Sequence, residues 1–182
     1  VAPENLLENQ TESIVATLPD TTANTHEETS QDKLSQFSKN ITDLKKQIQN
    51  SQGNPEILFI KLGDAYLDAQ RFMDAQKDTQ ERKSLLDFSE DKKLLLGSYE
   101  QATWAYKLAL NFNQKSADTH LKIGRIYDEM EDGKNSLMYV KLAHQIFKKA
   151  HKSSEMHETQ AFIESLTTKY KDISDKKTVH KG

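Results

Sequence analysis

Residues Gly97–Gln114 read GSYEQATWAYKLALNFNQ, and the stretch that follows, Ser116–Met130, reads SADTHLKIGRIYDEM. Small side chains and aromatic rings recur in both at helical spacing. Two antiparallel helices approach closely only where the facing side chains are small, and large rings then fill the space beside those contacts. Gly124 would provide such a gap on an outgoing helix, and Ala102 and Ala109 on a return helix. The pattern therefore predicts helical hairpins, each with an apolar face left to stack on another hairpin.

The composition favours an all-helical protein. Hydrophobic residues make up 35% of the 182 residues and charged residues 29%, while glycine and proline are few. Long helices tolerate this mixture, whereas an all-β protein needs many more turn residues. The chain contains no cysteine, which excludes disulfides, thiolate metal sites and a cysteine nucleophile. No apolar run approaches the roughly 20 residues that span a bilayer.

Charge divides the chain into three parts. Residues 1–30 are acidic, contain no lysine or arginine, and have only short apolar clusters at Leu6–Leu7 and Ile14–Val15, so we expect a disordered acidic leader. Residues 31–170 carry the apolar periodicity of a helical domain, and residues 171–182 predict a flexible, lysine-rich tail. A nucleic-acid-binding protein usually has a concentrated basic face with aromatic residues among it. The sequence has no such pattern, so we expect no nucleic-acid partner.

Apolar periodicity predicts a series of helices within the domain. The first is predicted over 31–50 with Ser30 as its N-cap, and the second starts at Pro55. Arg71–Ala75 resemble the opening of a return helix. Further helices are predicted over 84–96, with a break near Ser89, and over 98–113, 117–131, 134–151 and 154–170.

Several motifs resemble the tetratricopeptide repeat family. Leu62-Gly63-x-x-Tyr66 and Ile123-Gly124-x-x-Tyr127 are similar to its first-helix signature. Gly97-x-Tyr99-x-x-Ala102-x-x-x-Tyr106-x-x-Ala109-Leu110 is similar to its second-helix signature, and Asn54-Pro55 to the proline between repeats. The family period of about 34 residues is kept if Leu86 and His120 both lie on first helices. Gln114 and Val140 depart from the pattern, which has a proline and an aromatic residue there.

The resemblance covers about residues 54–150 and implies an all-α, right-handed superhelix of antiparallel helix pairs. In this family the stacked first helices line a concave groove that takes an extended peptide or a partner helix. The residues that match this groove by position are Ile57, Ile60, Asp64, Leu67, Asp118, Leu121, Arg125 and Asp128. Ile60 and Asp64 stand where chaperone-binding members have the Lys and Asn of a carboxylate clamp, so the resemblance does not extend to that clamp.

The leading interpretation is a non-catalytic scaffold or accessory subunit that promotes assembly of a larger protein complex. Its partner would be a segment or subunit of another protein, and stacking through the open ends of the solenoid would also allow self-association. The sequence contains no glycine-rich phosphate loop and no Gly-x-Ser-x-Gly motif. We therefore expect no enzymatic activity, no cofactor and no metal.

Alternatives remain at four points. His144 and His151 could share a helical face in a metal-binding or enzymatic domain, although zinc usually takes ligands at closer spacing. The helix over 31–50 could instead form a coiled-coil homodimer. Trp104 is expected to pack in the core, with a ligand platform as the alternative. The opening Val-Ala-Pro-Glu suits a mature exported chain, periplasmic or otherwise extracytoplasmic, and a cytoplasmic location is the alternative.

Overall fold

The computed structural model describes residues 29–76, 95 and 97–176, and within these ranges all regular structure is α-helical. The helices are α1 (Ser30–Gln49), α2 (Glu56–Ala75), α5 (Ser98–Phe112), α6 (Ala117–Glu129), α7 (Gly133–Lys149) and α8 (Ser153–Lys176). The predicted all-α class is confirmed for this part of the chain. The expected leader up to residue 28, nearly all of the helix predicted over 84–96, and the tail from 177 lie outside the described residues.

The first helix begins one residue earlier than predicted. Thr29 is the N-cap, because its hydroxyl accepts the Asp32 N–H at 3.2 Å while the Asp32 carboxylate accepts the Thr29 N–H at 3.0 Å. Ser30 stands too close to Asp32 for this reciprocal capping box, which needs a spacing of three. The apolar stripe of α1 is buried against α2, with Phe37 and Phe72 rings 5.7 Å apart. The seam that a coiled-coil dimer would need is therefore used within the chain.

The second helix is longer than predicted. Asn54 Oδ1 accepts the Glu56 N–H at 2.9 Å and so helps to start α2 beside Pro55. From there α2 continues without a break to Ala75. The expectation that Arg71–Ala75 open a return helix is wrong, because the contact of Phe72 with α1 continues the same apolar stripe by one more turn.

The return helix that pairs with α2 is α5. Tyr99, at the start of α5, donates a hydrogen bond to Asp74 near the end of α2, and Asn113, after α5, donates one to Glu56, so the two helices are antiparallel. A Cβ added to Gly63 would lie 2.6 Å from the buried Tyr106 ring. Leu86, expected on the first helix before α5, lies outside the described residues; among the described helices, α2 is the one that pairs with α5.

The second hairpin, α6 with α7, is also closely packed at a glycine, but with different residues around it. Gly124 of α6 provides the gap, and a Cβ there would lie 2.6 Å from Val140 of α7. The Ser136 hydroxyl donates a hydrogen bond to the Gly124 carbonyl at 2.8 Å, which ties the two helices at the same point. Val140 thus does the packing for which the family pattern uses an aromatic ring.

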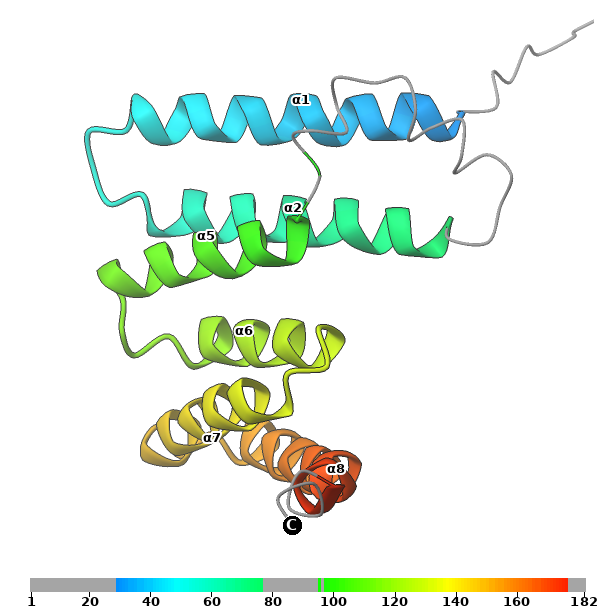
Figure 1. Cartoon of the computed structure of the whole chain (residues 1–182). Coiled ribbons are helices and arrows are strands. Elements are labelled where there is room, and N and C mark those ends of the chain that lie inside the picture. Colours follow the sequence, from blue (N-terminus) through cyan, green and yellow to red (C-terminus); the bar gives the residue numbers. More distant parts are fainter. Residues whose placement is uncertain (1–28, 77–94, 96, 177–182) are drawn as a thin grey trace, which may run out of the picture.

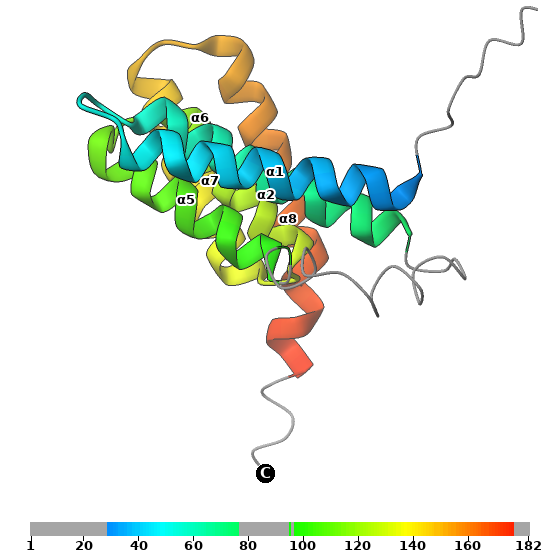
Figure 2. The ribbon, with the colours of Figure 1, turned by 90° about the horizontal axis from the view of Figure 1, so that it is seen from above.

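The helices stack in chain order. Each packs against the helices before and after it, from α1 to α8, and the closest pairs are α2 with α5 and α6 with α7 (Figure 1). Seen from above, the start of α1 lies beside the end of α2 (Figure 2). The last helix, α8, packs on α7 and runs to Lys176, past the expected end at 170. A glycine again permits the contact, because the Tyr170 ring of α8 lies over Gly133 of α7.

Candidate partner-binding surface

The α2 residues expected to line the groove differ in how far their side chains are exposed to solvent. Ile57 is 65% exposed and Ile60 is partly buried at the edge of the main core. Leu67 is a core residue, only 7% exposed, so it is not free to contact a partner as the groove expectation required. Of the α2 stripe, only its first turns therefore present apolar side chains to solvent.

Asp64 joins three helices. Its carboxylate accepts a hydrogen bond from the Tyr106 hydroxyl of α5 at 2.5 Å and pairs with Lys122 of α6. Burial of the ring, together with this bond to the carboxylate, raises the pKa of Tyr106 well above its ordinary value. The phenol therefore stays protonated and continues to donate to Asp64. The carboxylate is engaged within the chain rather than left for a partner.

Two of the α6 residues are linked to α8. Arg125 pairs with Glu158 at 2.5 Å, and its guanidinium also lies 5.5 Å from the centre of the Phe162 ring. Asp128 accepts hydrogen bonds from Lys169 at 2.7 Å and from the Tyr170 hydroxyl at 2.8 Å. The bond to Asp128 raises the pKa of Lys169. Helix α8 thus lies along the side of α6 that was expected to be open.

The other two α6 residues lie closer to its start. Asp118 is exposed in the first turn, where a negative charge suits the helix dipole. Leu121 is half-buried, because it packs with Met156 of α8 on a small core of Ala117, Ala143 and Phe147. The structure therefore brings Leu121 and Arg125 together beside α8, where Leu121 is half-buried and Arg125 remains about half-exposed.

Two ion pairs link α2 with α6. The Arg71–Glu129 and Lys122–Asp64 links both join residues 58 apart in the chain, so α2 and α6 run parallel. The bond to Glu129 raises the pKa of Arg71. Half-exposed pairs of this kind contribute only about 0–1 kcal/mol each. Their main consequence is that most charged side chains on this face are already paired.

Sequence reasoning missed a cavity at Trp104. This residue was expected to pack in the core, but it is 50% exposed on α5. It lines a shallow cavity of about 260 Å³. The other lining residues are Glu100, Thr103, Lys107, Tyr127 and Met130. The helical period alone could have placed Trp104 opposite Ala102 and Tyr106, both fully buried, and so indicated its exposure.

The histidines proposed as an alternative metal site are not brought together with further ligands. His144 forms a hydrogen bond with the Thr159 hydroxyl of α8 at 3.0 Å, and His151 is exposed after the end of α7. Among the described residues, no group of three or more histidine, cysteine, aspartate or glutamate side chains could hold a metal ion.

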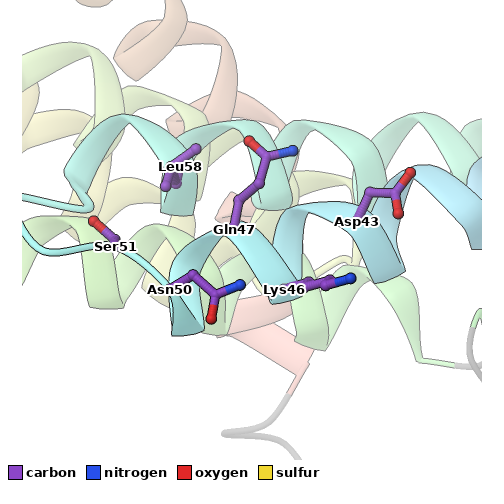
Figure 3. A pocket seen from close by; sticks show the side chains of 6 residues that line it. All are labelled: Asp43, Lys46, Gln47, Asn50, Ser51 and Leu58. Atoms are coloured by element: carbon purple, nitrogen blue, oxygen red, sulfur yellow. The ribbon is translucent and has the colours of Figure 1, made fainter.

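A second hollow lies where α1 turns into α2. It measures about 520 Å³ and opens widely to solvent between the end of α1 and the start of α2 (Figure 3). The residues that line it are Asp43, Lys46, Gln47, Asn50, Ser51 and Leu58. These groups are mostly polar and contain no nucleophile paired with a base, so the hollow offers no catalytic arrangement.

Within the described ranges, no helix has the length and apolarity needed to cross a membrane.

Comparison with known proteins adds little information about the function of this chain. No family model matches the chain, and no curated protein does. A solved structure titled "Crystal structure of MamA" is 17% identical over 80% of this chain and 96% of its own, with a TM-score of 0.27. A second, titled "Crystal structure of MamA protein", is 20% identical over 81% and 88%, also with a TM-score of 0.27. A superposition this loose supports no argument about family or function.

Proposed function

We propose that this chain is a non-catalytic interaction scaffold, built as a right-handed superhelix of the tetratricopeptide type, that holds a segment of another protein and so promotes assembly of a larger complex. The observation that carries this proposal is the parallel alignment of α2 and α6, with α8 crossing beside α6 and linked to it through Arg125–Glu158 and Lys169–Asp128. The close packing of Gly63 against Tyr106 and of Gly124 against Val140 occurs at the glycines of the two first-helix motifs and supports the repeat architecture.

The partner segment would bind at the start of α2 and α6. Ile57 and Ile60 offer apolar surface there, and Asp118 is the adjacent exposed charge. Because Asp64, Arg125 and Asp128 are already paired within the chain, contact with this face would rest on apolar area more than on charge. We therefore propose an extended segment with apolar side chains as the partner, rather than an acidic tail.

Matched substitutions in the full chain test this proposal. Ile57→Asp and Met138→Asp each place a carboxylate at an exposed apolar position, 65% exposed on α2 and 47% exposed on α7 respectively. Capture of partner proteins from native extract should fall at least about tenfold with Ile57→Asp, equivalent to about 1.4 kcal/mol, and stay unchanged with Met138→Asp. Helicity should match the parent in both. Loss of capture with Met138→Asp alone would place the partner on the return helices and refute binding at the start of α2.

A further inference from the structure

The outward side of α7 is basic and also carries two large apolar side chains. Lys134, Lys141 and Lys148 lie at heptad spacing, and α7 contains no acidic residue. At 3.6 residues per turn, these lysines and four further exposed residues lie within about 120° of the helix circumference. The opposite side of α7 is buried against α6 and α8. We call the exposed set the α7 arc, and its members are Lys134, Met138, Lys141, Leu142, Gln145, Lys148 and Lys149.

The four lysines of the α7 arc differ from other cations of the described chain in that their charges are not paired. Within the described ranges none of them forms an ion pair, whereas Lys122, Lys152 and Lys169 each pair with a carboxylate. Among these unpaired charges, Met138 is 47% exposed and Leu142 is 39% exposed. Exposed apolar side chains surrounded by polar ones mark sites of interaction with proteins or membranes. The α7 arc therefore suits a partner that offers negative charge and hydrocarbon together.

We propose that the α7 arc binds the surface of an anionic lipid bilayer. The phosphates of the headgroups would face the lysines, and the acyl chains just beneath them would take up Met138 and Leu142. Lysine suits this position because its aliphatic stem can lie along apolar surface while its ammonium stays in the polar layer. The contact is peripheral, with α7 lying in the plane of the bilayer, because its other side remains packed on α6 and α8.

Two other anionic partners match the α7 arc less well. Nucleic acids are bound through stacking on aromatic side chains as well as through charge, and the arc contains neither an aromatic residue nor an arginine. A peptide segment is usually held in a groove, and no residue of α7 lines either of the two hollows described above. Lysines spread along one helix face, with apolar residues among them, are typical of contact with an anionic membrane surface.

Co-sedimentation of the purified full chain with lipid vesicles tests this proposal. The parent should bind vesicles made of phosphatidylglycerol and phosphatidylcholine in equal parts, and should not bind vesicles of phosphatidylcholine alone. Raised salt should weaken the binding, because it screens the charges. Each lysine near an anionic surface contributes to the attraction, so reversing three of them should weaken binding to the anionic vesicles at least about tenfold. This α7 variant combines Lys134→Glu, Lys141→Glu and Lys148→Glu.

Two further variants separate the α7 arc from net charge and from folding. The matched control makes the same change of net charge at exposed lysines of other segments, and should bind nearly as well as the parent; it combines Lys39→Glu, Lys61→Glu and Lys115→Glu. The double variant Met138→Ser, Leu142→Ser keeps every charge and should still weaken binding at least about fivefold, because the apolar contact is lost. All three variants replace exposed residues, so their helicity by circular dichroism should match the parent.

Several outcomes would overturn the proposal. They include failure of the parent to bind either kind of vesicle, equal binding to both kinds, and equal losses with the α7 variant and the matched control. Binding that is lost with Lys176→Glu, Lys177→Glu, Lys181→Glu but kept by the α7 variant would assign the lipid contact to the tail instead. Binding of soluble polyglutamate that survives Met138→Ser, Leu142→Ser would assign the arc to an acidic protein segment. The vesicles contain no protein, so this result is separate from the test of the partner site at Ile57.

Discussion

Single glycines decide how closely the paired helices approach. Gly63 faces the ring of Tyr106, which is fully buried and has no room to move aside. Overpacking of this kind costs about 1–3 kcal/mol, while the better helix propensity of alanine returns up to about 1 kcal/mol. We therefore expect Gly63→Ala to lower the free energy of unfolding by about 1–2 kcal/mol, measured by urea denaturation. Gly53→Ala is the control, because a Cβ there meets nothing within 4 Å. Equal stability of the two variants would mean that α2 and α5 are not paired through Gly63.

Tyr106 also makes stability depend on pH. Burial and the bond to Asp64 raise the pKa of its phenol in the folded state, so its contribution is complete below the unfolded value near 10 and is lost as pH rises beyond that. The expected slope above pH 10 is about 1.4 kcal/mol per pH unit for this one group. Tyr106→Phe should make the fall in unfolding free energy from pH 9 to pH 11 shallower than in the parent. Parallel curves would show that the phenol is not held protonated.

Helix α8 buries Leu166 and is also linked to α6 by several charged contacts. Arg125 and Glu158 are both about half-exposed, so their pair contributes about 0.2–1 kcal/mol. Arg125→Glu turns this attraction into repulsion and removes the cation over Phe162. We expect faster amide exchange in α8 with little change in α2 and α5. The exchanged pair Arg125→Glu, Glu158→Arg should recover most of the protection. Failure of that recovery would show that Arg125 acts elsewhere.

Both ends of the described stack are polar on their outer side. Every exposed side chain of α1 is polar, and among residues 153–171 of α8 the only exposed apolar residue is Ala161. Terminal helices with polar outer faces close a stack of repeats. We therefore expect no end-to-end growth, although the sequence pattern suggested open ends. Sedimentation velocity should give one species whose mass does not rise with concentration. A series of larger species whose mass rises with protein concentration would contradict this expectation.

The motifs predicted helices well because their information is local. Leu34, Ile41 and Leu44 fall on one face at helical spacing, and the structure buries all three. The end of the second helix was predicted too early. Residues after Ala75 become polar, and the boundary predicted at Arg71 comes before that change. The contact of Phe72 with Phe37 joins two helices, so local pattern could not reveal it.

Composition and periodicity by themselves determined that the described domain is helical, and the small residues indicated where its helices pack, because both follow from the helical period and from side-chain size. Only the tertiary structure decided which helices pack against one another. It paired α2 with α5 across the intervening residues, laid α8 along Arg125 and Asp128, placed Leu67 in the core and left Trp104 half-exposed. These outcomes depend on contacts between segments far apart in the chain, and the same amphipathic stripe is compatible with several such partners.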